Sequence, residues 1–213
     1  MQDIISRHGQ RCEAATGKPT AFSMAEDTEQ FLWRSWDALL AITPEESRVI
    51  ADAVRPSQTL VTVPHAIPEV AEVPVTADTV VYAGSDNPSN QAAVRWLLRD
   101  VWPKVVAARP SSRLRLVGLI GEALRGEPEM AVPNVDVVGF VPDAVAEVAA
   151  AGVVVAPYLY GSGLKIKLIE AAATGRPIVT TTSGVEGSGL SDGNHLVVTD
   201  DATAVAGAIA RLD

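Results

Sequence analysis

The sequence predicts an α/β fold in which a doubly wound, parallel, Rossmann-like sheet follows an incomplete N-terminal α/β portion. From about residue 78 onward, apolar segments alternate with helical ones and the connections between them are short. The apolar segments are continuous runs, which is typical of strands buried on both faces. Helices that serve as crossovers between such strands imply a parallel sheet.

The elements of this second part follow from apolar runs and from the residues that break them. Strands are expected at 78–84, 114–118, 135–140, 152–156, 178–182 and 195–198. Helices are expected at 90–108, 122–125, 142–150, 164–174 and 202–212. Gly175 and Pro177 end the helix at 164–174, because glycine favours a helix C-terminus and proline cannot continue a helix.

The first 65 residues do not make a complete domain. A helix is expected at 28–36, a strand at 38–42, a helix at 45–54 and a strand at 60–63. Two strands and two helices cannot cover their own apolar faces. The segment 64–77 carries three prolines and no periodicity, which indicates a connector. We therefore divide the chain into the tail of one domain (1–65), an interdomain linker (66–77) and a whole second domain (78–213).

An apolar set in this N-terminal portion has no complete sheet to pack on. Its members are Trp33, Trp36, Leu39, Leu40 and Ile42. Large apolar patches rarely stay open in a monomer. We therefore expect the chain to self-associate through its incomplete N-terminal portion.

Composition excludes several classes of protein. The chain has 213 residues, and 47% of them are hydrophobic, a share that is typical of a globular protein rather than a disordered one. A net charge of −9 argues against a general nucleic-acid surface, and no apolar run approaches the ~20 residues that span a bilayer. The single cysteine, Cys12, excludes an internal disulfide, and the three histidines are isolated. We expect a cytoplasmic protein with no metal site and no cofactor.

The segment 161–177 carries the most chemical information. It reads as a strand end, a glycine loop, a basic helix start and a helix with one glutamate. Only four lysines occur in the chain, and two of them, Lys165 and Lys167, lie here. Backbone amides and lysines suit phosphates, and a carboxylate one turn further suits ribose hydroxyls. The pattern therefore favours a nucleoside diphosphate ligand.

A series of short motifs extends this pattern over the whole second part. In order they are Tyr82-Ala83-Gly84, Pro88-Ser89-Asn90, Leu116-Val117-Gly118, Val138-Gly139-Phe140-Val141-Pro142-Asp143, Ala156-Pro157, Gly161 to Ala171, Gly175 to Thr181 and Gly184-Val185-Glu186-Gly187. Together they resemble the nucleotide-sugar-binding half of retaining, two-domain (GT-B fold) glycosyltransferases of the group 1 or family 4 type. The resemblance covers about residues 78–213. Residues 1–65 also resemble the last part of that family's acceptor domain.

The resemblance implies a role for each matching residue, and it leaves the catalytic residue unassigned. Glu170 would grip the two ribose hydroxyls, because a carboxylate can accept both protons at once. The diphosphate would be held by Ser162, Gly163, Lys165 and Lys167, and the base by Phe140, Val141 and Asp143. Gly84, Ser85, Asn90, Glu186 and Gly187 would lie at or near the donor sugar.

Several of these assignments have structural alternatives. Lys165 and Lys167 are two apart and cannot share one helix face, so one lysine is expected at the diphosphate. Lys167 has the family's spacing to Glu170 but could instead form a surface pair with it, and Lys165 lies nearer the helix start. Ser162 could be a helix N-cap, and so could Asn90.

The sequence also departs from the wider family at two places. Ser162 stands where many members have a glutamate that contacts the sugar. The segment 84–90 lacks the arginine and the Lys-Gly pair that many members carry there. The sugar contact of that glutamate is therefore not expected of Ser162, and the ligand contacts of Ser85 and Asn90 are left open.

The activity that the resemblance implies is hexosyl transfer from a UDP- or GDP-linked sugar to an acceptor hydroxyl with retention. The acceptor could be a glycan, a lipid or a small molecule. Two alternatives stay open: a nucleotide-sugar-binding remnant without transferase activity, and a GT-B-fold nucleotide-sugar 2-epimerase. A dinucleotide-dependent oxidoreductase is disfavoured, because Ile166 occupies the third glycine position of that fingerprint.

Overall fold

The computed structural model describes residues 4–20 and 23–212. The chain divides into two compact units. The first comprises Met1–Ala66 together with two loops, Tyr160–Ile166 and Glu186–Gly189. The second comprises Ile67–Leu159, Lys167–Val185 and Leu190–Asp213.

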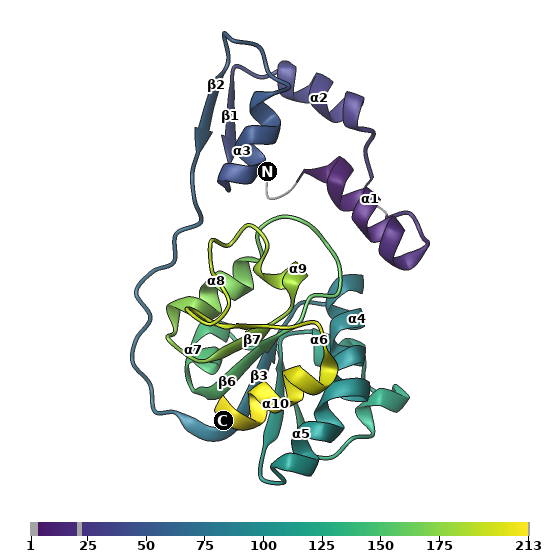
Figure 1. Cartoon of the computed structure of the whole chain (residues 1–213), viewed down its shortest axis with the longest axis vertical. Helices are drawn as coiled ribbons and strands as arrows, with labels where there is room; N and C mark the ends of the chain where they lie inside the picture. Colours follow the sequence, from purple (N-terminus) through teal and green to yellow (C-terminus); the bar gives the residue numbers. More distant parts are fainter. Residues whose placement is uncertain (1–3, 21–22, 213) are drawn as a thin grey trace. The chain divides into compact units, whose positions relative to one another are not determined.

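The second unit is built on a six-stranded sheet in which every paired strand is parallel (Figure 1). In sheet order the strands are β5 (Val135–Gly139), β4 (Arg113–Val117), β3 (Thr76–Ala83), β6 (Ala151–Ala156), β7 (Ile178–Thr180) and β8 (Val197–Val198). Counted within this unit, that order is the 3-2-1-4-5-6 of a Rossmann sheet, with its switch point between β3 and β6. The predicted doubly wound parallel sheet is therefore confirmed.

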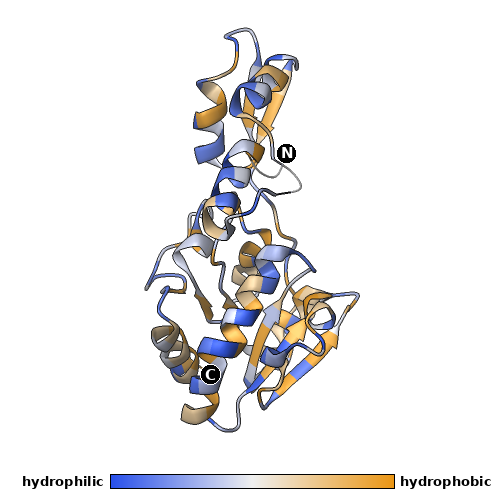
Figure 2. Ribbon diagram, turned by 90° about the vertical axis from the view of Figure 1, so that its right-hand side faces the viewer, coloured by the Kyte–Doolittle hydropathy of each residue, from blue (hydrophilic) through white to orange (hydrophobic). Residues whose placement is uncertain are grey.

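Helices cover both faces of this sheet. One face packs on α4 (Pro88–Trp96), η1 (Leu97–Val101), α5 (Trp102–Ala108), α6 (Ile120–Ala123) and α10 (Ala202–Leu212). The other face packs on α7 (Ala144–Ala149) and α8 (Ile166–Ala173). Successive residues of β3 alternate between the two cores: Val80 and Tyr82 lie in one, Val81 in the other. Figure 2 shows the strands largely in orange with some blue stretches, as expected for a sheet whose central strands are buried on both sides. Charged residues do occur in β3, β4 and β5, namely Asp78, Arg113, Arg115 and Asp136.

The helix predicted at 90–108 begins at Pro88 and contains a wider turn. Residues Leu97–Val101 form a π-helical turn, and the amide of Trp102 donates to the carbonyl of Leu97. Pro103 follows directly and has no amide to continue the ladder. The indole of Trp102 is fully buried and donates to the carbonyl of Pro133 at 2.8 Å, which ties this turn to the β5 end of the sheet.

The first unit contains a helix that the sequence analysis missed. It consists of α1 (Ile5–Thr16), α2 (Glu26–Arg34), β1 (Ala38–Ala41), α3 (Pro44–Ala51) and β2 (Thr59–Thr62), and the two strands are parallel. Glu29 is 1% exposed, and its carboxylate accepts the amides of Ile5 and Ser6 at 2.8 and 3.0 Å. A carboxylate from α2 thus caps the positive end of α1.

The apolar set of the N-terminal portion is only partly open, which corrects the expectation. Trp33 and Leu39 are buried with Ile4, Ala41, Ile50 and Ala53 in a small core of the first unit. Trp36 and Leu40 remain 63% and 59% exposed and border an apolar pocket of about 240 Å³.

Two buried tyrosines link the stability of the second unit to pH. Burial raises the pKa of Tyr82 well above its usual value, and burial together with the charge of Glu170 raises the pKa of Tyr158 to about 12. Between pH about 10 and about 12 the unfolded chain loses protons that the folded chain keeps. We therefore expect the free energy of unfolding to fall across this window, by about 1.4 kcal/mol per pH unit for each tyrosine.

Urea titrations at a series of alkaline pH values measure this effect, and Tyr158→Phe should make the decline shallower. A free energy of unfolding that stays constant over the whole window would contradict the assignment of these two groups.

Candidate functional site

The carboxyl ends of β3 and β6 mark the expected ligand edge of the second unit, because the strand order reverses between them. After β3 the chain turns at Gly84 and Ser85 into α4. After β6 it continues through Pro157 and Tyr158, which are both buried. Thr180 and Thr181 of the neighbouring strand end fix this exit, as their hydroxyls donate to the carbonyls of Ala156 and Tyr158 at 2.6 and 2.7 Å. The sequence analysis missed this role of the threonines, and their run at a strand end was the available signal.

Asn90 holds the turn after β3 from inside. It is 5% exposed, accepts the hydroxyl of Tyr82 at 3.1 Å and donates to the carbonyl of Ser85 at 2.9 Å. The cap of α4 is Asn87, whose side chain accepts the amide of Asn90, so the alternative of Asn90 as a helix cap is wrong. Ser85 itself is exposed at the end of the strand.

The three residues predicted at the base differ in their surroundings. Phe140 leaves its ring 76% exposed directly after β5. Val141 packs partly against the core beneath α7 and α8. Asp143 caps α7 by accepting the amide of Ala146 at 2.9 Å. Phe140 is thus the one of the three that offers an open apolar surface to a ligand.

Glu170 and Lys167 lie half-buried on α8. The charge of Glu170 contributes to the raised pKa of Tyr158, which places the carboxylate near the end of β6. Within the part of the chain that the structure describes, Lys167 and Glu170 form no ion pair with each other. The alternative of a simple surface pair therefore finds no support in the structure.

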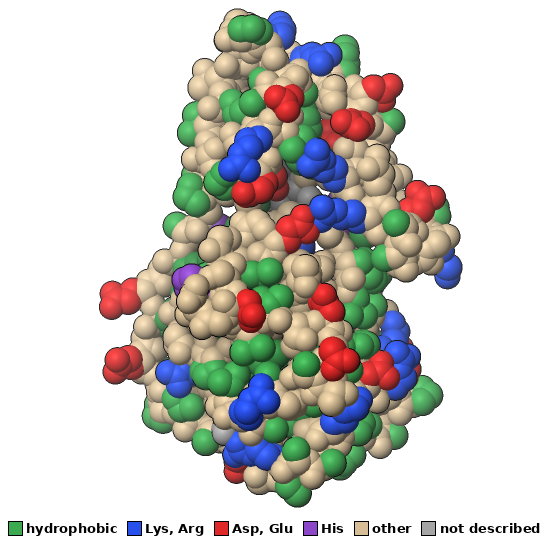
Figure 3. Space-filling view, viewed as in Figure 1, with side chains coloured by type: hydrophobic (Ala, Val, Ile, Leu, Met, Phe, Trp, Pro, Cys, Tyr) green, Lys and Arg blue, Asp and Glu red, His purple; other side chains and the backbone are tan. Residues whose placement is uncertain are grey.

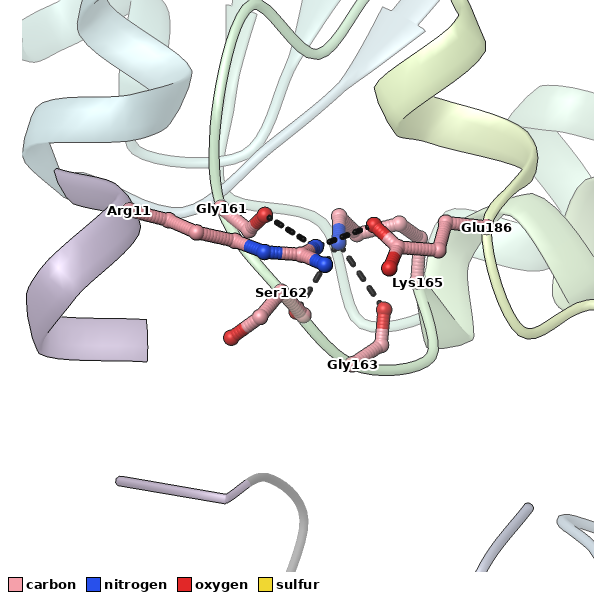
Figure 4. A network of polar contacts seen from close by, with 6 residues as sticks. All are labelled: Arg11, Gly161, Ser162, Gly163, Lys165 and Glu186. Carbon is pink, nitrogen blue, oxygen red and sulfur yellow. Dashed lines mark hydrogen bonds and ion pairs between the residues drawn. The ribbon is translucent and has the colours of Figure 1, made fainter. Parts of the chain in front are cut away.

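The glycine loop belongs to the first unit and precedes α8. Because α8 begins at Ile166, Ser162 and Gly163 lie in the loop rather than in the first helical turn, which corrects the expected helix start and the serine N-cap. The ammonium of Lys165 donates to the carbonyls of Ser162 and Gly163, both at 2.9 Å (Figure 4).

An arginine that the sequence analysis did not single out joins the two loops of the first unit. Arg11, on α1, forms an ion pair with Glu186 at 2.5 Å and donates to the carbonyl of Gly161 at 3.4 Å (Figure 4). A pocket of about 70 Å³ lies here, and its lining includes Arg7, Arg11, Ser162, Gly163, Glu186 and Gly187. Four of the predicted site residues are thus brought together in the first unit.

A metal site and a membrane-spanning helix each require features that the described residues lack. They contain no group of three or more His, Cys, Asp or Glu side chains placed to hold a metal ion. None of the helices described is long and apolar enough to cross a membrane. On the face shown in Figure 3, acidic and basic side chains are interspersed.

Comparison with known proteins bears on the family and on the fold. A family model described as group 1 glycosyl transferases matches residues 77–212. The phosphatidyl-myo-inositol mannosyltransferase of Mycobacterium leprae (strain TN) is 32% identical over 151 residues, which are 68% of this chain and 40% of that protein. The chain therefore spans about two fifths of the length of this curated relative.

Solved structures show the same architecture. A mutant of S. aureus TarM, in complex with Fondaparinux, alpha-GlcNAc-glycerol and UDP, has a TM-score of 0.69 and 17% identity over 90% of this chain and 40% of its own. The pneumococcal O-GlcNAc transferase GtfA, in complex with UDP and GlcNAc, has a TM-score of 0.67 and 14% identity over 92% of this chain and 42% of its own. At this identity the likeness establishes the fold, which is the Rossmann-like GT-B fold.

Proposed function

The chain belongs to the group 1 glycosyl transferases, and from this premise we propose that it is the donor-binding half of an enzyme that transfers a hexose from a nucleoside-diphosphate sugar to an acceptor hydroxyl with retention. The observation that supports the donor site best is that groups suited to a nucleoside diphosphate follow one another along the chain on either side of Ile166. The loop before it presents glycine-loop amides, and the helix that it opens carries a lysine and a glutamate without a mutual ion pair.

Each part of the donor has a partner of suitable chemistry. Glu170 would accept hydrogen bonds from the ribose hydroxyls, and the loop amides and Lys167 would donate to the diphosphate oxygens. The exposed Phe140 would pack against the base. We infer a uridine nucleotide from the neighbours, since TarM and GtfA were both solved with UDP. In this arrangement amides and a lysine would stabilise the leaving diphosphate, because their dipoles and charge would face the oxygens where negative charge develops.

The remaining parts of the proposal concern the acceptor, the location and the assembly. The acceptor class is a glycan, a lipid or a small molecule, and the protein would act in the cytoplasm. Trp36 and Leu40, together with the exposed Phe31, give the first unit an apolar surface through which the chain would self-associate.

Calorimetric titration of the chain with UDP and with GDP tests the proposal. We expect heat of binding with UDP and weaker binding with GDP. The absence of heat with both nucleotides, on a sample shown to be folded, would overturn the donor-binding role.

Replacing Lys167 by alanine separates a phosphate contact from a packing role. We expect affinity for UDP to fall about ten-fold, since a charge-assisted hydrogen bond is lost, while affinity for uridine changes little. Added salt should reduce the difference between the wild type and the variant. Lys104→Ala, on α5, is the matched control and should bind both ligands as the wild type does. Equal losses for UDP and uridine would remove Lys167 from the diphosphate.

A further inference from the structure

The glycine loop presents two amides that the protein itself leaves unused. Within the described residues, the amides of Gly163 and Leu164 donate no hydrogen bond, although both residues are half-buried. Gly163 has a φ of 70°, which a residue with a side chain rarely adopts. A half-buried amide that lacks a protein acceptor is satisfied by water or by a ligand. The two amides therefore mark the face of the loop on which a hydrogen-bond acceptor, from water or from a ligand, binds.

The carbonyls of the same two peptide units are held from the opposite side. Each peptide unit joins the carbonyl of one residue to the amide of the next. The Gly163 amide therefore shares its peptide unit with the Ser162 carbonyl, and the Leu164 amide shares its unit with the Gly163 carbonyl. Lys165 donates to both of these carbonyls at 2.9 Å. In a trans peptide the N–H and C=O bonds point in opposite directions, and no cis peptide bond occurs among the described residues. The ammonium thus turns both amides away from itself.

Arg11 continues this arrangement by one peptide unit. Its guanidinium donates to the carbonyl of Gly161, and its partner Glu186 keeps it at the loop (Figure 4). Successive carbonyls therefore face cationic groups, and successive amides are directed to the other side. Consecutive amides on one side of a loop make a concavity that binds anions.

We propose that Lys165 is a positioning residue: it fixes the loop so that the amides of Gly163 and Leu164 bind a phosphate of the donor, and Arg11 supports the same conformation. This inference rests on the proposed function and deepens it. It also assigns Lys165 a different role from the phosphate contact that the sequence predicts. In this proposal Lys167 keeps the direct contact with the diphosphate.

The unliganded protein gives the first test, since a positioning residue acts before any ligand binds. Lys165→Met removes the charge and keeps the length of the side chain, and Lys165→Gln is a second neutral variant. In nitrogen–proton NMR spectra of the free chain, we expect both variants to shift the resonances of Gly163 and Leu164 and to change their exchange rates. Lys165→Arg should leave these resonances near their wild-type positions.

Titration with UDP and with uridine gives the second test. We expect the neutral variants to bind UDP about ten-fold more weakly than the wild type and uridine within about two-fold, and Lys165→Arg to recover most of the UDP affinity. If the neutral variants lose UDP affinity while the free loop resonances stay unchanged, Lys165 contacts phosphate directly and the inference is overturned. It is also overturned if the neutral variants bind UDP like the wild type. If the wild type binds no UDP, the proposed function fails instead, and the resonances of the free protein still show whether Lys165 sets the loop.

Discussion

Glu170→Gln is expected to weaken UDP binding by about 1–3 kcal/mol and to leave the fold intact. The range is that of hydrogen bonds to a charged group, and the change removes the charge while keeping the shape. The fold should tolerate it because Glu170 is only half-buried on α8 and pairs with no basic side chain among the described residues. Calorimetry with UDP measures the loss, and thermal unfolding measures the stability.

The same variant carries an internal check on its surroundings. Because the charge of Glu170 contributes to the raised pKa of Tyr158, Glu170→Gln should lower that pKa below about 12. Glu129→Gln, another half-buried glutamate of the second unit, is the matched control and should change neither UDP binding nor the titration of Tyr158. A collapse of the melting temperature with unchanged affinity per folded molecule would show that Glu170 is structural.

Gly118→Ala is expected to destabilise the second unit by several kcal/mol. Gly118 follows β4 with a φ of +89°, and a Cβ placed there would lie 2.3 Å from the carbonyl oxygen of Gly84. That oxygen belongs to the backbone of the neighbouring strand end, so it cannot rotate away. Forcing an atom into such a contact costs about 1–3 kcal/mol or more, in addition to the strain of the positive φ.

Gly126→Ala separates these two costs. Gly126 has nearly the same φ, +87°, but nothing lies within 4 Å of its Cβ position. We expect it to lose only the conformational part, about 1 kcal/mol. Urea unfolding of both variants gives the comparison, and the difference between them measures the close approach of the β3 and β4 ends. Equal losses in the two variants would mean that the strand ends can separate without cost.

The parallel sheet could be predicted because its signal lies in consecutive residues. The run Val153-Val154-Val155 is apolar on both faces of β6, and such runs occur where helices cover both sides. The site residues of the loops could be named for a similar reason, since glycines, lysines and one glutamate stand at short spacing in 161–170.

The features that escaped prediction depend on contacts between distant residues. Helix α1 is capped by Glu29, which lies on another helix, and its own N-cap residue, Ile4, is not of a type that would indicate a helix start. Arg11 meets Glu186 across most of the chain length, and no spacing rule connects them. The hydrogen bonds from Lys165 to the carbonyls of Ser162 and Gly163 were not predicted either, because charge can be read from sequence whereas the direction of a peptide plane cannot. Asn90 looked like a helix cap because only the fold brings it to Tyr82.

An NMR map of the chain titrated with UDP tests the central claim most directly, because it reports each residue separately. The account predicts saturable shifts of the amides of Gly163, Leu164 and Glu170, together with those next to Phe140, and no shifts at the distant Lys104. Saturable shifts confined to other residues, or no shifts at all on a folded sample, would contradict the assignment of this chain as a donor-binding half.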